Sequence, residues 1–368
     1  MTARGQADAG QGARGGAGGA PGPDGRAGRR QESLVFEVTQ ACNHACLHCY
    51  NAWKNPVDYP MGELATAETL AVLDKAVDES GARLVSLSGG EPLLRADLFE
   101  IVDHLVARGI TVNLITNGSL VTEAVVAHLA GKISVWELPL LSVEAAVHDR
   151  MSGRPGAFDR ATMAMAELKA ARERVVGVFV ATRLNLSAWK ETAELAVALG
   201  LDGIMFNRFN PGGEGARHLE ELQAGPEDLA AALDAADRLS ERYEIPISCS
   251  IAMPPCLFDH ARYKRLGFGF CAAGTPRAYY TIDPLGNLRP CNHSPTILGN
   301  LRRAGFWELA DGEAMRRFVA ARPAFCAGCR LEAECLGGCK AAAEACSGCA
   351  SAMDPFLAAY SHRATKVR

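Results

Sequence analysis

Three cysteines lie close together in the chain: Cys42, Cys46 and Cys49 follow a β-prone stretch, residues 34–39. Three thiolates on a loop at the carboxyl end of a strand can hold three irons of a cubane iron–sulfur cluster and leave its fourth iron open. An open coordination position is what a metal centre needs in order to bind a reactant. The alternative is a zinc site that adds His44 or His48, although this spacing is not that of a zinc knuckle. The loop is therefore a candidate catalytic centre.

A second group of cysteines lies toward the C-terminus, because ten of the thirteen cysteines fall between residues 249 and 350. The chain has no apolar N-terminal segment of the kind that directs secretion, so its thiols are expected to stay reduced. Such a count favours metal or cluster ligation over disulfides, with a zinc double knuckle as the alternative. The spacing Cys-x2-Cys-x5-Cys-x3-Cys is formed by Cys326, Cys329, Cys335 and Cys339, and Cys271 and Cys291 precede it on either side of Gly286.

The composition excludes several functional classes. The 368 residues are 48% hydrophobic and 22% charged, with a formal net charge of −4, which is typical of a globular protein. This charge provides no global basic field for nucleic acid or an anionic membrane. No apolar run reaches the roughly 18 residues that span a bilayer. We therefore expect a cytoplasmic protein with no nucleic-acid partner and no membrane partner.

The elements that must position the first cysteines alternate regularly between strand and helix. This alternation predicts an α/β fold with a parallel sheet and right-handed crossovers. The sheet is expected to form a partial (β/α)6 barrel of the TIM type, and a flat doubly wound sheet would give the same pattern. The predicted strands are residues 34–39, 84–88, 111–116, 133–138, 175–181 and 203–209, and the predicted helices are residues 67–80, 97–108, 122–130, 157–171, 188–199 and 226–243.

The chain divides into three predicted regions. Residues 1–30 are rich in glycine, alanine and arginine and bury too little apolar surface to fold, so we expect a disordered tail. Residues 31–245 form the α/β core. The alternation is expected to stop after the helix at 226–243, and residues 246–368 are expected to form a cysteine-rich domain whose core is inorganic rather than apolar.

A second motif follows the second predicted strand, where the chain reads Gly89-Gly90-Glu91-Pro92. Two glycines let a backbone approach a ligand closely, and a carboxylate there can accept hydrogen bonds from an ammonium group. In isolation this segment is more often an ordinary tight turn. Its position one strand–helix unit after the cysteine loop makes it a candidate binding segment.

The cysteine spacing and the Gly-Gly-Glu-Pro segment together resemble the radical SAM superfamily. The resemblance implies that Cys42, Cys46 and Cys49 hold a [4Fe–4S] cluster whose open iron binds S-adenosylmethionine. An electron from the cluster then cleaves the cofactor to a 5′-deoxyadenosyl radical that abstracts hydrogen from a substrate. By the same resemblance, Gly89, Gly90 and Glu91 bind the methionyl amino group.

The resemblance also implies further cofactor contacts. His48 stands where relatives place a large apolar or aromatic residue near the adenine, which is a departure from the usual pattern. Ser142, after the fourth strand, is expected at the ribose. Arg183 and Asn185, after the fifth strand, are expected near the carboxylate and ribose, and a surface salt bridge is the alternative for Arg183.

The C-terminal cysteines resemble the SPASM extension of radical SAM enzymes, which carries auxiliary [4Fe–4S] clusters. The resemblance assigns the first auxiliary cluster to Cys256, Cys271, Cys291 and Cys339. It assigns the second to Cys326, Cys329, Cys335 and one downstream cysteine, for which Cys346 is favoured over Cys349. Cys249 and Cys349 are then surplus, and a thiol such as Cys249 could be the hydrogen donor of an epimerase.

Enzymes with this extension mostly modify peptides, so the resemblance implies a ribosomally made peptide substrate and an oxidative outcome such as crosslinking. Cofactor or small-molecule biosynthesis, such as tetrapyrrole decarboxylation or sugar dehydrogenation, is the alternative, followed by peptide epimerisation. Sulfatase maturation is disfavoured because Asn292, an amide, stands where that subgroup has a basic aspartate. A non-enzymatic electron-transfer protein would have no use for the Gly-Gly-Glu-Pro segment. Expected partners are a separate leader-recognition protein and a reductant such as flavodoxin or ferredoxin.

Overall fold

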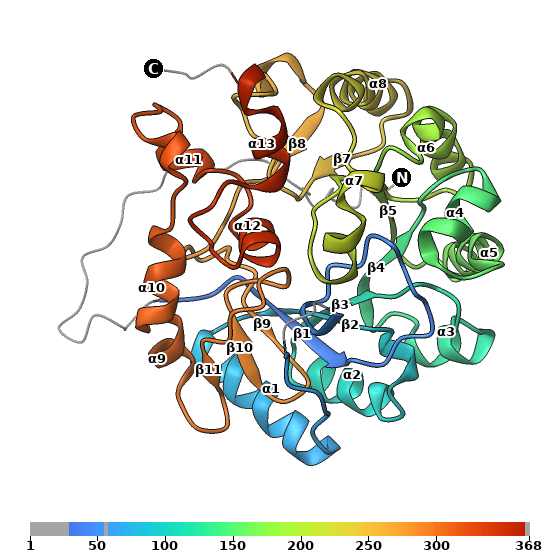
Figure 1. The fold of residues 1–368 in the computed structure, drawn as a ribbon. Coiled ribbons are helices and arrows are strands. Elements are labelled where there is room, and N and C mark those ends of the chain that lie inside the picture. Colours follow the sequence, from blue (N-terminus) through green and yellow to red (C-terminus); the bar gives the residue numbers. More distant parts are fainter. Residues whose placement is uncertain (1–28, 55–57, 365–368) are drawn as a thin grey trace, which may run out of the picture.

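The computed structural model describes residues 29–54 and 58–364. Within these residues, strands form one continuous sheet in the order β11-β10-β9-β1-β2-β3-β4-β5-β6-β7-β8. All neighbours from β9 to β8 in this order are parallel. The sheet curves around a central space, with helices on its outer side (Figure 1). The chain therefore has the partial α/β barrel that its sequence predicts.

The predicted core elements are confirmed within two residues at each end. Apolar side chains of the strands and of the inner helix faces form one buried cluster that includes Phe36, Trp136 and Phe206. The core strands are β1 (Ser33–Thr39), β2 (Leu84–Gly89), β3 (Thr111–Ile115), β4 (Ile133–Pro139), β5 (Val175–Ala181) and β6 (Gly203–Arg208). The helices are α1 (Thr66–Ser80), α2 (Leu98–Ala107), α3 (Glu123–Leu129), α5 (Ala157–Ala170), α6 (Trp189–Ala198) and α8 (Pro226–Tyr243). Two helices that the sequence did not predict are α4 (Ala145–Ser152) and α7 (Leu219–Leu222).

The sheet continues beyond the point where the alternation was expected to stop. Strands β7 (Ile247–Cys249) and β8 (Leu266–Phe268) extend it in parallel past β6. Three-residue strands carry too little periodicity to be recognised in a sequence, and only their pairing with a long neighbour defines them. The expected end of the α/β pattern near residue 245 is therefore corrected.

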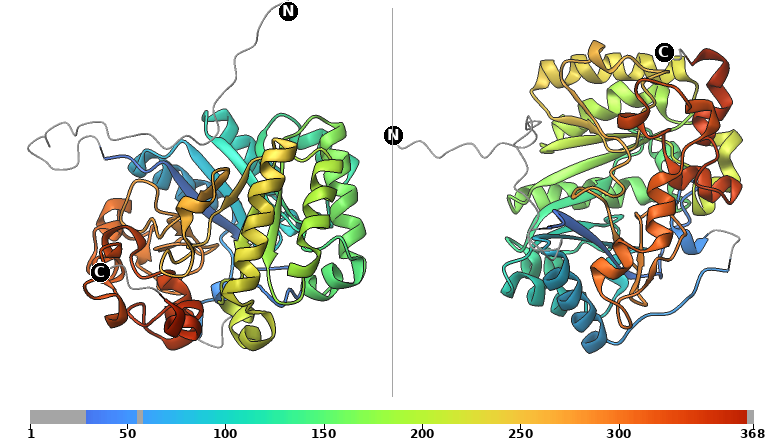
Figure 2. Two further views of the ribbon diagram at one scale, coloured as in Figure 1. Left: turned by 90° about the horizontal axis from the view of Figure 1, so that it is seen from above. Right: turned by 90° about the vertical axis from the view of Figure 1, so that its left-hand side faces the viewer.

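The C-terminal region packs against the open side of the barrel (Figure 2). Strand β9 (Thr281–Ile282) pairs with β1, and β10 (Asn287–Arg289) and β11 (Gly299–Asn300) continue antiparallel. A hairpin turn, in which the Gly286 amide donates to the Asp283 carbonyl at 2.9 Å, joins β9 and β10. The remaining helices of this region are α9 (Phe306–Ala310), α10 (Glu313–Ala320), α11 (Glu332–Cys335), α12 (Lys340–Ser347) and α13 (Pro355–Tyr360).

Most of the predicted N-terminal tail, residues 1–28, lies outside the described residues. The last two residues of the predicted range are in contact with the folded chain. Arg29 forms an ion pair of 2.7 Å with Asp311, and the Arg30 guanidinium donates to the Gly81 carbonyl at 2.8 Å. Arg29 and Arg30, the last residues of the predicted range, are therefore held against the folded chain. None of the described helices is both long and apolar enough to cross a membrane.

Candidate active site and cluster sites

The cysteine loop after β1 is held by backbone contacts with the Gly-Gly-Glu-Pro segment. The amide of Gly90 donates to the Thr39 carbonyl and the amide of Glu91 donates to the Ala41 carbonyl, both at 2.8 Å. A Cβ on Gly89 would lie 2.4 Å from the Thr39 oxygen, and one on Gly90 would lie 2.0 Å from the Ala41 oxygen. Neither position accepts a side chain without moving this loop. The glycines thus fix the loop that carries the cysteines.

Two other glycines, remote in sequence, complete this support. A Cβ on Gly153, at the end of α4, would lie 2.2 Å from the Ala45 carbonyl oxygen. One on Gly213, after β6, would lie 2.4 Å from the Asn51 carbonyl oxygen. Both glycines have positive φ angles, 58° and 48°, which other residues adopt at a cost. Their role was missed in the sequence because it depends on contacts between distant segments.

The Glu91 side chain is fully buried and used within the protein. One of its oxygens accepts from the Leu93 amide at 3.1 Å and from the Thr116 hydroxyl at 2.7 Å, and the other accepts from the Asn117 amide at 2.7 Å. Burial raises the pKa of Glu91, and these hydrogen bonds oppose that shift. Asn117 in turn donates to Asn43 in the cysteine loop at 2.8 Å. Glu91 therefore ties the ends of β2 and β3 to the loop.

The three cysteine thiols of the loop lie near one another. Burial raises the pKa of Cys46, and the neighbouring Cys49 and Cys42 thiols raise it further, whereas the Lys54 ammonium lowers it. A cluster that binds thiolates would relieve this burial cost, because the metal neutralises the charge. Among the described residues, no three or more His, Cys, Asp or Glu side chains are arranged to hold a single metal ion. The donor set and its backbone support fit a three-cysteine cluster site.

Two histidines of the loop are neutral. Burial lowers the pKa of His44 to about 4, and neither ring nitrogen has a hydrogen-bond partner in the described part of the chain. Burial also lowers the pKa of His48 to about 4. His48 lines the central cavity of the barrel. This position is compatible with the expected contact to the adenine, which stays a prediction.

The barrel encloses a central cavity of about 470 Å³. That volume is in the range of small-molecule sites. Alternate residues of the core strands line it, since successive side chains of a strand face opposite sides. Cys271, Cys291 and Cys339 of the C-terminal region form part of its wall. The polar lining from the strands includes Ser86, Asn113, Glu137 and Asn207.

Glu137, on β4, is an acidic group that the sequence reasoning missed. Its side chain lines the cavity, and no described residue forms a hydrogen bond with its carboxyl group. Burial alone raises its pKa to about 7. On the adjacent β3, the side-chain oxygen of Asn113 is buried and has no partner among the described residues. Unpaired polar groups of this kind facing a cavity indicate a ligand site.

Two of the predicted cofactor contacts do not lie on the cavity wall. Ser142 is fully buried, and its hydroxyl accepts a hydrogen bond from the Glu144 amide at 3.1 Å. Pro139 and Leu141 line the cavity at this end of β4 instead. Arg183 is exposed, and its guanidinium donates to the Gln223 carbonyl at 3.2 Å. Neither side chain lines the cavity, and their expected contacts with the ribose and carboxylate stay predictions.

The Asn185 side chain is hydrogen-bonded to backbone groups of the protein. Its amide nitrogen donates to the carbonyls of Leu141 and Val180, at 2.6 and 2.9 Å, and its oxygen accepts from the Thr182 amide at 2.8 Å. The side chain is fully buried. These bonds occupy the donors and the oxygen of the amide group, so Asn185 links the ends of β4 and β5. Its expected contact near the carboxylate and ribose stays a prediction.

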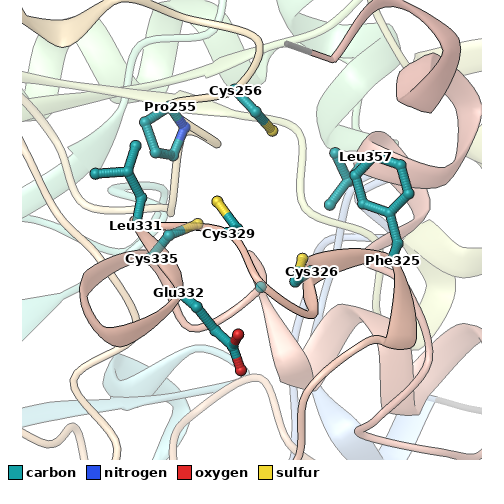
Figure 3. A pocket seen from close by; sticks show the side chains of 10 residues that line it. Pro255, Cys256, Phe325, Cys326, Cys329, Leu331, Glu332, Cys335 and Leu357 are labelled. Atoms are coloured by element: carbon teal, nitrogen blue, oxygen red, sulfur yellow. The ribbon is translucent and has the colours of Figure 1, made fainter. Parts of the chain in front are cut away.

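One group of C-terminal cysteines surrounds a small pocket. The sulfurs of Cys256, Cys326, Cys329 and Cys335 point toward a common space, which Pro255 and Leu357 help to enclose (Figure 3). Burial raises the pKa of Cys256 to about 12, and the nearby thiols of the other three add to this effect. The resemblance assigns Cys256 to the other group. In the structure, the loop after β7 places Cys256 beside the Cys326–Cys335 segment.

The second group comprises Cys271, Cys291 and Cys339. Burial raises the pKa of Cys291 to about 12, and the neighbouring thiols of Cys339 and Cys271 raise it further. Cys346, the expected ligand of the second cluster, is exposed on α12 and lines neither this cavity nor the small pocket. Its place in the ligand set is thus not supported by the geometry.

The two halves of the molecule meet between these cysteines and the first loop. Tyr50 stacks on His293 with ring centroids 3.8 Å apart, and the Asn292 amide donates to the Tyr50 hydroxyl at 3.2 Å. The Asn210 amide lies 3.0 Å from the His293 Nδ1 atom and donates to the Cys339 sulfur at 3.3 Å. Side chains next to Cys49 and to Cys291 are therefore in direct contact.

Comparison with known proteins agrees with this arrangement. Residues 36–196 match the radical SAM superfamily, and residues 271–330 match an iron–sulfur cluster-binding domain called SPASM. A PqqA peptide cyclase from Methylocella silvestris is 31% identical over 79% of this chain and 74% of its own length. The mycofactocin maturase MftC of Mycolicibacterium smegmatis is 30% identical over 74% of this chain and 68% of its own. An AdoMet-dependent heme synthase from Methanosarcina barkeri is 28% identical over 82% of this chain and 91% of its own length.

Solved structures share the fold at lower identity. SuiB of Streptococcus suis, bound to its precursor peptide SuiA, superposes with a TM-score of 0.70 at 16% identity, covering 89% of this chain and 76% of SuiB. The structure of anSMEcpe with bound AdoMet superposes with a TM-score of 0.68 at 15% identity, covering 90% of this chain and 95% of anSMEcpe. At such identities the likeness concerns the arrangement of barrel and C-terminal domain.

Proposed function

This chain belongs to the radical SAM superfamily and has a C-terminal SPASM domain, and from this premise we propose that it oxidatively modifies a ribosomally made peptide. It is an enzyme whose cofactors are [4Fe–4S] clusters and S-adenosylmethionine. The reaction that we propose begins with hydrogen abstraction from a side-chain or α carbon of the peptide. The product has two hydrogens fewer than the substrate, as in crosslinking.

One observation carries the proposal of net oxidation: the cavity beside the first cysteine loop has auxiliary-site cysteines on its wall. The bound cofactors supply a 5′-deoxyadenosyl radical when one electron reaches the first cluster. The substrate radical left by hydrogen abstraction must then lose an electron, and Cys271, Cys291 and Cys339 would hold an acceptor at the same cavity.

The charges of the side chains that line the cavity favour a peptide substrate over a tetrapyrrole. A tetrapyrrole substrate carries several carboxylates and needs cations to bind them. The cavity instead presents the unpaired carboxyl group of Glu137. Its two cationic side chains are already engaged, since Arg208 pairs with Asp354 and Lys340 donates to backbone carbonyls. A neutral or basic peptide segment matches this lining better.

Epimerisation is less well supported, because it needs a thiol that donates hydrogen at the cavity. Cys249 is buried within β7 and is 1% exposed, and the neighbouring residues Ser250 and Ile251 line the cavity instead. Burial raises the pKa of Cys249 to about 12, as in a small apolar core residue. The proposed reaction therefore places no deuterium from heavy water in the product.

The experiment that tests the proposal uses anaerobically reconstituted protein, S-adenosylmethionine, a flavodoxin or ferredoxin reductant, and a short peptide encoded beside this gene. A separate leader-recognition protein is added where one is encoded there. We expect one 5′-deoxyadenosine per product and a peptide mass lower by two hydrogens. Decarboxylation of an added tetrapyrrole with no change in the peptide would overturn the proposal. An unchanged mass with one solvent deuterium would indicate epimerisation instead.

A further inference from the structure

We infer that Glu137 and Asn113 form a subsite of the central cavity for a primary ammonium group on an alkyl chain, such as a lysine side chain of the substrate. The inference rests on the proposed function, because it concerns a peptide in the same cavity, and it names the side chain that is held there. Glu137 is the only acidic residue among the described residues that line the cavity. A cationic group of the substrate therefore has one place on this wall where its charge can be paired.

The two side chains lie on neighbouring strands and on the same face of the sheet. Asn113 of β3 is in register with Val135 of β4, and Ile115 is in register with Glu137. Since alternate residues of a strand share a face, Asn113 and Glu137 both face the cavity and are offset by two residues along the strands. Ser86 of β2 is in register with Asn113 and also lines the cavity. Polar side chains from three successive strands thus border one part of the cavity.

The chemistry of these groups selects a ligand that donates several hydrogen bonds. The side-chain oxygen of Asn113 is buried and has no partner among the described residues, and burial is the one influence on the Glu137 carboxyl group. A carboxylate, an amide oxygen and a hydroxyl can all accept hydrogen bonds. An ammonium group has three donors that point in different directions, whereas the planar guanidinium group directs its donors as a fork at one partner. Acceptors that come from three strands therefore match an ammonium group.

The lining next to Glu137 is apolar on the side away from Asn113. Pro139 follows on the same face of β4 and is in register with Val178 of β5, and Val180 lies beyond it. An alkyl chain can pack on these side chains while its ammonium group reaches the polar ones. The amino terminus of a peptide has an amide group next to its charged nitrogen, and that amide would be buried here without a partner. A lysine side chain therefore fits better than an amino terminus.

The groups that face Glu137 do not neutralise its charge. Strands β3 and β5, its two neighbours in the sheet, contain no titratable side chain. Across the cavity, burial raises the pKa of Tyr50 and Tyr279, and the charge of Glu137 raises it further, so both hydroxyls stay protonated. Burial raises the pKa of Glu137 to about 7 in the absence of a ligand. A bound cation favours the charged carboxylate and lowers this pKa, so binding below pH 7 releases a proton.

The remaining titratable side chains of the described cavity wall offer Glu137 no cation. Arg208 forms a buried ion pair, and the Lys340 ammonium donates to backbone carbonyls. The two histidines are neutral, because burial lowers the pKa of His48 to about 4 and that of His293 to about 3. The three thiols of the wall belong to the cysteine group described above. A cation that pairs with Glu137 must therefore come from a ligand.

The test follows the Glu137 carboxyl group by infrared spectroscopy. Reconstituted protein with S-adenosylmethionine and no reductant is titrated anaerobically, and the carbonyl stretch of the protonated carboxyl group is the difference between the parent protein and Glu137→Gln. Without a ligand we expect this band to disappear with a midpoint near pH 7. Saturating butylammonium should lower the midpoint by about one pH unit, which equals about tenfold tighter binding to the charged form. A midpoint that butylammonium leaves unchanged would overturn the inference.

Matched probes identify the chemistry of the ligand. Butanol has a similar chain and no charge, so it should leave the midpoint unchanged. Propylguanidinium and glycinamide represent an arginine side chain and an amino terminus, and each should shift the midpoint less than butylammonium does. A larger shift with either probe would overturn the assignment to a lysine-like group. The midpoint should be the same without S-adenosylmethionine, and a midpoint lowered by the cofactor alone would show that Glu137 serves the cofactor.

A variant of the second side chain completes the test. Asn113→Leu keeps the volume of the side chain and removes its acceptor, so butylammonium should shift the midpoint less than in the parent protein. Glu220→Gln, at an exposed position, is the control and should keep the full shift. An undiminished shift in Asn113→Leu would exclude Asn113 from the subsite. No peptide product is needed, so a full shift with an unmodified peptide contradicts only the proposed function, and a modified peptide without a shift contradicts only this inference.

Discussion

At the scale of single residues, Glu137 is a buried acidic group with no compensating partner among the described residues. Burial beside the cavity raises its pKa from 4.5 to about 7. The folded protein therefore binds this proton more tightly than the unfolded chain does. The protonated Glu137 carboxyl group therefore makes its full contribution to the free energy of unfolding below about pH 4.5, and this contribution is lost as the pH rises through 7.

Replacing this carboxyl group with an amide removes the titration. We expect Glu137→Gln to be more stable than the parent protein at pH 8.5, and the difference to be smaller at pH 6 by roughly 1 kcal/mol. The difference in the free energy of unfolding between the two proteins is measured at both pH values, on reconstituted protein under anaerobic conditions. Glu220→Gln, at an exposed position, is the control and should show no such trend. A pH-independent difference for Glu137→Gln would contradict the assigned environment.

At the scale of elements, the cysteine loop depends on close backbone approach by three other segments. Gly90 makes the tightest of these contacts, because a Cβ there would lie 2.0 Å from the Ala41 carbonyl oxygen. We expect Gly90→Ala to lose about four of about twelve irons and most cleavage of S-adenosylmethionine, while the auxiliary clusters remain. Gly267→Ala is the control, since a Cβ at that position meets only ordinary contacts at 3.8 Å. Full iron occupancy in Gly90→Ala would show that the loop adjusts to the added methyl group.

The same contacts explain which elements could be predicted from the sequence. Strands β1 to β6 and their helices are long enough to show their periodicity, and the Cys42–Cys49 spacing is local. The positions of Ser142, Arg183 and Asn185 depend on how the loops after β4 and β5 bend, which no local pattern specifies. The grouping of Cys256 depends on a loop closing across some seventy residues. Sequence spacing therefore predicts that these cysteines bind metal, and tertiary contacts decide which of them share a cluster.

At the scale of the whole molecule, two buried ion pairs join the barrel to the C-terminal domain. Glu37 on β1 pairs with Arg289 on β10, and Arg208 on β6 pairs with Asp354 just before α13. All four side chains are at most 2% exposed. Burial raises the pKa of Glu37 to about 7, against the attraction of Arg289. These pairs lie at the two sides of the junction and fix the auxiliary cysteines relative to the cavity.

The Arg208–Asp354 pair also reaches a cluster ligand, because Asp354 accepts a hydrogen bond from the Cys339 amide at 2.9 Å. Asp354→Asn leaves the Arg208 charge buried and unpaired, which costs about 3–5 kcal/mol. We expect a corresponding loss of stability in anaerobic unfolding, together with a changed spectrum of the cavity cluster. Glu313→Gln, which breaks an exposed pair with Arg317, should alter stability by less than about 1 kcal/mol. Equal effects of the two substitutions would mean that the barrel and the C-terminal domain are not held together by this buried pair, and that the auxiliary cysteines reach the cavity through strand pairing and packing alone.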